Sequence, residues 1–355
     1  EILLRLTLRA AFAFHWRGSP LKYKPMPRKK NNAAIVDVTG VGINATDTII
    51  DLPRFPEFNS KLELCSATVF PGGQVTSALV ACRRWGLSAR YVGSVGDDSA
   101  ATLQSRELKR HSIESHLIRV PNCPSQLSFI LVDGRSGERT ILWKRDPRLT
   151  LLPRHLQRRW ITKSKILLVD GHDTAGAAHA ARWARAACIP VVADVDNLYA
   201  GVEVLLENTD YLFASQEFPS RLLKIPGLLA SLPMISKRFG CKVTGVTLGC
   251  LGALAWDGAR FHYCPGYRVA AVDTTGAGDI FHAGIAYGIS RRLELDAILE
   301  FSCAAAALNC TARGARGGIK SSPEIRKFMR KAKRSERAFS SEQLARHARI
   351  QGMHS

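Results

Sequence analysis

Residues 273–279 have the types and spacing that could carry out phosphoryl transfer. They read Asp-Thr-Thr-Gly-Ala-Gly-Asp and run directly into an apolar stretch with helical character. The first N–H groups of a helix have no intrahelical partner and the helix dipole favours negative charge there, so small residues let the backbone bind an anion. Asp279 lies just inside this turn, where its carboxylate can take a proton from an attacking hydroxyl group. A helix cap alone would explain one Asp or Thr, but not three small residues between two carboxylates.

The elements that must position this motif follow a regular order along the chain. The predicted strands are residues 33–42, 90–95, 165–170, 190–195, 211–214 and 243–248, and the predicted helices begin near residues 74, 99, 172, 277 and 295. Short apolar strands that alternate with helices of 10 to 15 residues are typical of α/β proteins with a mostly parallel, doubly wound sheet. In such folds ligands bind beyond the carboxyl ends of the strands.

Two stretches, residues 44–70 and 120–145, do not fit this alternation. The first contains Pro53 and Pro56 and has little helical periodicity. The second alternates apolar and polar residues around a glycine-containing turn at 134–137, which is typical of a β-hairpin. We therefore expect the two stretches to form a separate small sheet.

The string 273–279 closely resembles the C-terminal signature of the ribokinase-like (PfkB) carbohydrate kinases. Weaker motifs occur in the order that this family shows: the pair Gly72–Gly73 before a helix, the GDD turn at 96–98, VTLGCLGAL at 246–254 and RGA at 313–315. The resemblance covers residues 33–319. It implies a three-layer α/β/α fold with the small sheet as a lid over the active site.

The resemblance also implies an activity, namely ATP-dependent phosphorylation of a hydroxyl on a ketose, a pentose or a related sugar, with Mg²⁺ as cofactor. In this assignment Asp279 is the general base, and the amides of Gly276, Ala277 and Gly278 form an anion hole for the transferred group. Asp273 and the carbonyl of Thr275 match positions that hold a monovalent cation such as K⁺ in many relatives.

On the substrate side, the resemblance implies that Asn44, Asp47 and the backbone at Gly72 and Gly73 hold the sugar hydroxyls. Asn44 could instead be a turn residue, and Gly73 could serve a plain tight turn. The chain departs from the family where GGKGAN becomes GGQVTS, which puts Ser77 at the position of a sugar-contacting Asn.

Lys144 and Arg145 follow the second strand of the predicted hairpin. We expect Arg145 to meet the γ-phosphate of ATP or a phosphate on the substrate, and the alternative is a solvated strand end.

The nucleotide side is predicted from small residues. Thr247, Gly249, Gly252 and Gly314 would let ATP lie against the backbone, although an ordinary turn between strands also explains the first three. The N-x-x-E element, which organises Mg²⁺ and its waters in the family, is reduced here to Ala-Ser-Gln-Glu. Glu217 is the candidate for the magnesium side, acting through water, and the alternative is an exposed Glu at a helix start.

The positive charge of the chain is concentrated at its ends. The 355 residues carry a formal net charge of +20, which invites a nucleic-acid interpretation. Residues 1–30 hold eight Lys or Arg and one acidic residue. Residues 320–355 hold ten Lys or Arg and three acidic residues, so each end carries a net charge of +7. We therefore expect a flexible basic extension over 1–32, a kinase domain over 33–319 and a basic tail over 320–355. The remaining +6 suits anionic ATP and requires no nucleic acid.

The cysteines and the apolar segments give an expected location. The nine cysteines are scattered and include no C-x-x-C pair, which favours a reduced cytoplasmic compartment. No run of about 18 apolar residues is present, and Arg5 and Arg9 interrupt the apolar stretch at 2–16, so neither a membrane span nor a signal peptide is expected. The resemblance implies a homodimer that pairs through the lid.

Four other functions compete with the sugar kinase. A dinucleotide-dependent dehydrogenase is disfavoured because the G-x-G-x-x-A pattern at 40–45 leads into a stretch without helical periodicity. A P-loop kinase is excluded by the absence of G-x-x-x-x-G-K-[ST]. A nucleoside kinase remains open, as does a non-catalytic protein that responds to a sugar or a nucleotide, although the latter would not need Asp279.

Overall fold

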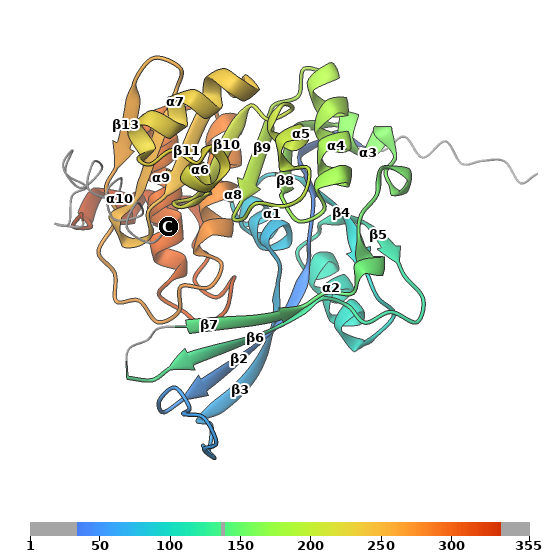
Figure 1. Ribbon diagram of the computed structural model, residues 1–355, viewed down its shortest axis with the longest axis vertical. Helices are drawn as coiled ribbons and strands as arrows, with labels where there is room; N and C mark the ends of the chain where they lie inside the picture. The colour runs from blue at the N-terminus through green and yellow to red at the C-terminus, as the bar shows by residue number, and fades with distance from the viewer. Residues whose placement is uncertain (1–33, 136–138, 335–355) are drawn as a thin grey trace, which may run out of the picture. The chain divides into compact units, whose positions relative to one another are not determined.

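The computed structural model describes residues 34–135 and 139–334 and is built around a nine-stranded sheet (Figure 1). The strand order is β13-β12-β11-β10-β9-β8-β1-β4-β5, and all pairs are parallel except those that β12 makes with β11 and β13. The strands are β1 (Val36–Val41), β4 (Ala89–Val95), β5 (Glu114–Arg119), β8 (Ser164–Asp170), β9 (Val191–Val195), β10 (Tyr211–Ser215), β11 (Val243–Thr247), β12 (Ala253–Trp256) and β13 (Phe261–Cys264). Both faces of the central strands are buried, which explains their nearly continuous apolar sequences.

Helices cover both faces of this sheet. They are α1 (Gln74–Arg84), α2 (Ser99–Arg110), α3 (Arg158–Thr162), α4 (Thr174–Ala186), α5 (Val202–Leu206), α6 (Phe218–Leu223), α7 (Leu228–Phe239), α8 (Ala277–Ser290), α9 (Leu295–Asn309) and α10 (Ser322–Lys331). Because side chains alternate along a strand, Leu168 belongs to the core under α1, α8 and α9, and Leu167 belongs to the core under α4 and α5. The predicted three-layer, mostly parallel α/β fold is confirmed.

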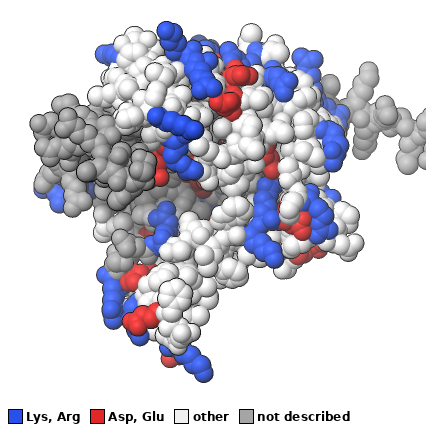
Figure 2. Space-filling view, in the orientation of Figure 1, with Lys and Arg blue, Asp and Glu red and all other residues white. Residues whose placement is uncertain are grey.

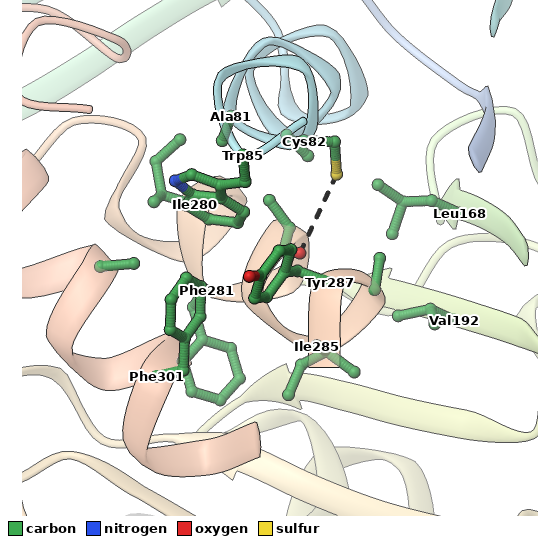
Figure 3. Close-up of a cluster of buried hydrophobic side chains, with 14 of the residues drawn as sticks. Ala81, Cys82, Trp85, Leu168, Val192, Ile280, Phe281, Ile285, Tyr287 and Phe301 are labelled. Carbon is green, nitrogen blue, oxygen red and sulfur yellow. Dashed lines mark hydrogen bonds between the residues drawn. The ribbon is translucent and has the colours of Figure 1, made fainter. Parts of the chain in front are cut away.

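Aromatic rings hold three of these elements together. Trp85 follows α1, and its ring lies 5.6 Å from that of Tyr287 on α8 and 5.1 Å from that of Phe301 on α9 (Figure 3). The Tyr287 and Phe301 rings stack at 4.6 Å. Edge and offset contacts of this kind add about 0.5–1.5 kcal/mol per pair beyond burial, so they fix the direction of α8, which carries the 273–279 motif at its start.

A second, four-stranded sheet forms the predicted lid and projects from the larger sheet (Figure 1). Its order is β3-β2-β6-β7, with β2 (Ala45–Leu52), β3 (Ser66–Gly72), β6 (Leu127–Asp133) and β7 (Arg139–Lys144). In this register Asp47 lies opposite Ser128, and Ser128 lies opposite Trp143. Residues in one such row share a face of the sheet, so these three side chains point the same way.

The C-terminal end of the described region differs from the prediction of a tail over 320–355. Helix α10 buries Ile325 completely, and its Phe328 ring lies 5.1 Å from the ring of Tyr267. The guanidinium of Arg334 lies 3.9 Å from the centre of the same Tyr267 ring. Residues 320–334 therefore pack on the domain, while the predicted extension over 1–32 and residues 335–355 lie outside the described residues. Among the residues that the structure describes, none of the helices combines the length and apolar character needed to span a bilayer.

Candidate active site

A cavity of about 1120 Å³ lies between the lid and the start of α8. Its lining comes from the inner face of the lid, from the loop at 247–252, from the segment at 196–199 and from the first turn of α8. Lys and Arg side chains form separate groups on the face shown in Figure 2 and are interspersed with acids. That distribution agrees with a body that is only mildly basic.

The predicted anion hole lies at the first turn of α8. Gly276 adopts φ +75°, and a Cβ there would lie 2.4 Å from the carbonyl oxygen of Ala315, so this position requires glycine. A Cβ on Gly278 would meet nothing within 4 Å, which shows that its backbone faces open space. The Ala277 amide donates to the carbonyl of Thr274 at 3.3 Å, whereas the amides of Gly278 and Asp279 have no protein acceptor among the described residues. The open donors thus include the amide of Asp279, which the sequence did not point to.

Asp279 lines the cavity from the same first turn of α8 as these amides. Burial raises the pKa of its carboxyl well above the usual range, and the nearby carboxylates of Asp194 and Asp47 raise it further, while His282 and Arg316 oppose this. A carboxylate whose pKa is raised towards neutrality is well matched to proton transfer.

His282, one turn further along α8, anchors this helix to the sheet. Its Nδ1 lies 2.7 Å from the carbonyl oxygen of Gly278 and 3.2 Å from Oδ2 of Asp194 on β9. Its Nε2 lies 3.0 Å from the carbonyl oxygen of Phe213 on β10. Neither His282 nor Asp194 was singled out from the sequence, because each lies in an apolar run that is also explained by burial alone.

Asp273 and Asn309 hold the loop that backs the anion hole. The two carboxylate oxygens of Asp273 accept hydrogen bonds from the amides of Thr275 and Gly314, both at 2.8 Å. The side-chain amide of Asn309 donates to the carbonyl oxygens of Thr275 and Ala315 at 3.2 and 3.1 Å. The Asp273 carboxylate and the Thr275 carbonyl, which were predicted to bind a monovalent cation, therefore already accept hydrogen bonds from the protein. The binding of K⁺ at this position stays a prediction.

The glycine pair brings the backbone close to Asp47. A Cβ on Gly72 would lie 1.9 Å from Oδ2 of Asp47, and Gly73, at φ +93°, would place a Cβ 2.5 Å from Cα of Asn44. Asp47 and Gly73 both line the cavity. Burial raises the pKa of Asp47 to about 6, although Ser128 and Arg316 act to lower it. The structure thus places Asp47 and Gly73 together in the cavity that also holds Asp279.

Arg316 is a half-buried cation beside the glycine pair that the sequence did not reveal. Its guanidinium donates to the carbonyl of Gly72 at 2.8 Å, to Oγ1 of Thr76 at 2.9 Å and to Oγ of Ser77 at 3.2 Å. Burial lowers the pKa of Arg316 to about 10, and the carboxylates of Asp47 and other nearby acids counter this. Ser77, which was predicted to contact the sugar, is outside the cavity lining, and its hydroxyl accepts a hydrogen bond from Arg316 instead. No local signal predicts this contact, because it joins residues 239 positions apart.

Two predicted substrate contacts are occupied by protein partners. The Asn44 side chain is buried outside the cavity lining, and its amide donates to the Tyr91 hydroxyl at 2.7 Å and to the Ser94 carbonyl at 2.9 Å. Arg145 forms a bidentate pair with Asp173, at 3.0 and 2.7 Å. Both side chains are therefore structural in this conformation, because buried polar groups first satisfy their own hydrogen bonds.

The predicted nucleotide side shares the same cavity. Thr247, Gly249 and Gly252 all line it. Gly252, at φ +101°, leaves no room for a side chain, since a Cβ would lie 1.9 Å from the carbonyl oxygen of Cys264. Gly314 is outside the lining and holds Asp273 through its amide. These small residues line the predicted nucleotide side of the cavity largely with backbone.

Magnesium has few protein candidates here. Glu217 is exposed at the start of α6 and does not line the cavity, so any role would act through water. The described residues include no cluster of three or more His, Cys, Asp or Glu that could hold a metal ion. Such a site is consistent with Mg²⁺ in phosphoryl transfer, which is commonly held by one or two carboxylates together with substrate phosphates and waters.

The fold and the motif together define a small-molecule kinase with a lid. A family model described as pfkB family carbohydrate kinase matches residues 38–322. The ATP-dependent ribose-1-phosphate kinase of Halopiger xanaduensis is 26% identical over 285 residues, which cover 79% of this chain and 94% of that protein.

Solved structures show the same fold at lower identity. The ribokinase of Thermotoga maritima superposes with a TM-score of 0.71 at 24% identity, covering 83% of this chain and 99% of the other. The ribokinase of Arabidopsis thaliana complexed with ribose and ATP gives a TM-score of 0.71 at 20% identity, covering 83% and 98%. The chain belongs to the pfkB family of carbohydrate kinases, which confirms the family and fold expected from residues 273–279.

Proposed function

We propose that the protein transfers the γ-phosphoryl group of ATP to a hydroxyl of a small sugar. The observation that carries this proposal is a single cavity that holds Asp279 beside the open amides of Gly278 and Asp279, with Asp47 and Gly73 at one side and the 247–252 loop at the other. The ATP-dependent relative supports the choice of phosphoryl donor.

The proposed mechanism assigns each group one task. Asp47 accepts hydrogen bonds from sugar hydroxyls, and Asp279 takes the proton of the hydroxyl that attacks phosphorus. The open amides stabilise the charge on the transferred group, and a single donor of this kind is worth about 3 kcal/mol in comparable sites. Mg²⁺, when bound with ATP, neutralises charge on the β and γ phosphates. The lid limits the access of water, which would otherwise hydrolyse ATP.

A panel of ketoses, pentoses and nucleosides, each incubated with Mg²⁺ and ATP while ADP release is measured, tests the proposal. We expect turnover with one or more sugars. Turnover with adenosine-type nucleosides alone would support the nucleoside kinase instead, and binding without turnover on any acceptor would favour a non-catalytic binding protein. A thermal-shift screen of the same panel reports binding independently, because a ligand that binds only the folded state stabilises it.

The activity is expected to fall at acid pH. Asp279 acts only when ionised, and its pKa is raised, while burial places the pKa of Asp47 at about 6. As the pH drops through these values both carboxylates become neutral, so kcat/KM should decrease by about tenfold per pH unit or more. A profile of kcat/KM between pH 5 and 9 measures this, and a flat profile below pH 6.5 would contradict it.

We also propose that the protein forms a homodimer through the outer face of the lid. Val69, Phe129 and Leu142 form part of one row across that face, together with Thr48, and remain 55%, 42% and 53% exposed. Exposed apolar patches of this kind mark interaction sites.

Replacing Phe129 with Glu is expected to turn a dimer into a monomer in size-exclusion chromatography with light scattering. The matched control is Leu229→Glu, which changes an exposed apolar residue of α7 and should leave the dimer intact. A wild-type protein that is monomeric at tens of micromolar, or a Phe129→Glu variant that remains dimeric, would contradict the proposal.

A cytoplasmic location is proposed from the cysteines. All nine are free thiols in the structure, and six of them are buried. Free thiols are typical of proteins kept in a reducing compartment.

A further inference from the structure

Four side chains form a corner of the cavity that the proposed mechanism does not use. Trp143, His172, Asp196 and Tyr199, together called the aromatic corner, all line the cavity. Trp143 comes from β7 of the lid, His172 from the turn between β8 and α4, and the other two from the segment between β9 and α5. The Trp143 and His172 rings meet edge to face at 5.8 Å, and the His172 and Tyr199 rings lie 4.6 Å apart.

The aromatic corner adjoins the acceptor end of the cavity. Trp143 lies in the same row of the lid as Asp47 and Ser128, so its Cα is about 10 Å from that of Asp47, which is two strand spacings. Arg139, at the other end of β7, lies near Cys310 instead. A substituent on a sugar held by Asp47 can therefore reach the aromatic corner without entering the nucleotide end.

Hydrogen bonds leave the aromatic corner rich in acceptors. The Tyr199 hydroxyl donates to Oδ1 of Asp196 at 2.8 Å. Because the hydroxyl proton of Tyr199 is donated to that carboxylate, its oxygen can only accept a hydrogen bond from Nε2 of His172, which lies 2.9 Å away. Burial lowers the pKa of His172, which favours the neutral ring, and with Nε2 as the donor to Tyr199 the lone pair lies on Nδ1. The acceptors that the corner can offer to a ligand are thus this nitrogen and Oδ2 of Asp196, which is exposed, and both require a hydrogen donor.

The charges behind the aromatic corner are mostly negative. Asp170 and Asp173 are buried nearby, and Arg145 is paired with Asp173, whereas burial raises the pKa of Asp194 and favours its neutral form. Burial raises the pKa of Tyr199, and the carboxylates of Asp196 and Asp170 raise it further, so Asp170 adds to this field. A phosphate or carboxylate on the substrate would be repelled here, whereas a cation would be attracted by the carboxylates and by the ring faces.

We propose that the aromatic corner binds a positively charged, amine-bearing substituent of the sugar, so that aminated sugars are better acceptors than neutral sugars or sugar phosphates. This inference rests on the proposed kinase function and adds the substrate class. Trp143 and Tyr199 supply ring faces, and Asp196 supplies the carboxylate that pairs with the ammonium group. His172 accepts a further N–H hydrogen bond through Nδ1.

Three acceptors with one carbon skeleton test the inference: fructose, 1-amino-1-deoxyfructose and fructose 1-phosphate. We expect kcat/KM for the amine to exceed that for fructose by about tenfold or more, in line with an ammonium group paired inside a ring-lined site, and the phosphate to be the poorest acceptor. In Asp196→Asn the ratio of amine to fructose should fall towards one. The control is Glu203→Gln, which removes a surface carboxylate on α5 and should leave the ratio unchanged.

The outcomes separate this inference from the kinase proposal. A phosphate preferred over the amine, an amine no better than fructose, or a ratio that Asp196→Asn does not change would each overturn it. If none of the three is phosphorylated, calorimetric titration of the amine and of fructose still tests whether the aromatic corner binds an ammonium group. Binding of the amine that is at least tenfold tighter in wild type, and lost in Asp196→Asn, supports the aromatic corner even where the kinase proposal fails, and equal binding overturns it.

Discussion

Replacing Asp279 with Asn is expected to lower kcat by about 10²- to 10⁴-fold while ATP still binds. Asn has nearly the same shape, so the first turn of α8 and its open amides remain in place, but it cannot take the proton of the attacking hydroxyl. The measurement is a steady-state assay of ADP release on the best sugar, together with calorimetric titration of ATP. The dissociation constant of ATP should change by no more than about threefold, because the substitution removes proton transfer and leaves the nucleotide side of the cavity intact.

The same variant should be more stable than the wild type at neutral pH. A carboxyl whose pKa is raised in the folded state destabilises that state once the pH exceeds its unfolded value, and Asn removes this cost. We therefore expect a higher melting temperature at pH 7.5 together with lost activity. Asp296→Asn is the control, since Asp296 also lies in the first turn of a helix, α9, but outside the cavity. An Asp279→Asn variant that keeps more than a tenth of the wild-type kcat would exclude Asp279 as the base.

Replacing Arg316 with Gln is expected to have the second largest effect, a loss of about 10²-fold in kcat/KM. The variant loses donors to the carbonyl of Gly72 and to the hydroxyls of Thr76 and Ser77. Hydrogen bonds from a charged group are worth about 1.5–3 kcal/mol each, so the start of α1 and the glycine pair should become less well ordered. The Michaelis constant for the sugar is expected to rise, since Gly73 lines its site.

The pH profile of kcat/KM for Arg316→Gln distinguishes the loss of the Arg316 charge from a mere loss of packing. Arg316 lowers the pKa of both Asp47 and Asp279, so without it these values rise and the acid limb of kcat/KM moves to higher pH. Arg316→Lys keeps the charge and should restore the acid limb without restoring the Michaelis constant. Arg313→Gln, which changes an exposed arginine of the same loop, serves as the control. An unchanged acid limb in Arg316→Gln would contradict this account.

The parts of the site that follow from local rules could be predicted from the sequence. Residues 273–279 specify a helix start, and Gly276 adopts the positive φ that such a turn needs. The pair Gly72–Gly73 lies against Asp47 and Asn44, where any Cβ would clash. Strands buried on both faces are recognisable as short apolar runs, which is why the large sheet could be foreseen.

The parts that depend on long-range partners could not be predicted. Asn44 and Arg145 have residue types suited to ligands, but the fold supplies each with a protein partner, Tyr91 and Asp173 respectively. Arg316 is the converse case, since a basic residue in a polar loop becomes a half-buried cation that donates to the glycine pair. The edge strand β5 reads Glu-Ser-His-Leu-Ile-Arg, which shows neither a continuous apolar run nor the alternation of polar and apolar residues that marks a strand. In each case the deciding contact joins segments that are far apart in the chain.

Helix α10 was missed for a different reason. It carries four basic residues among its ten positions, and these mask the pattern of the apolar residues Ile325 and Phe328 that face the domain. Spacing of three to four residues between apolar positions was the available signal.

The central claim is that the γ-phosphoryl group of ATP passes to a sugar hydroxyl in the cavity beside Asp279. Phosphorus NMR of a reaction with Mg²⁺, ATP and each sugar of the panel tests it most directly. For the true substrate, we predict that the γ resonance of ATP disappears while one phosphomonoester resonance grows in equal amount, and that Asp279→Asn forms neither. Release of inorganic phosphate alone, or full retention of ATP with every sugar, would contradict the claim.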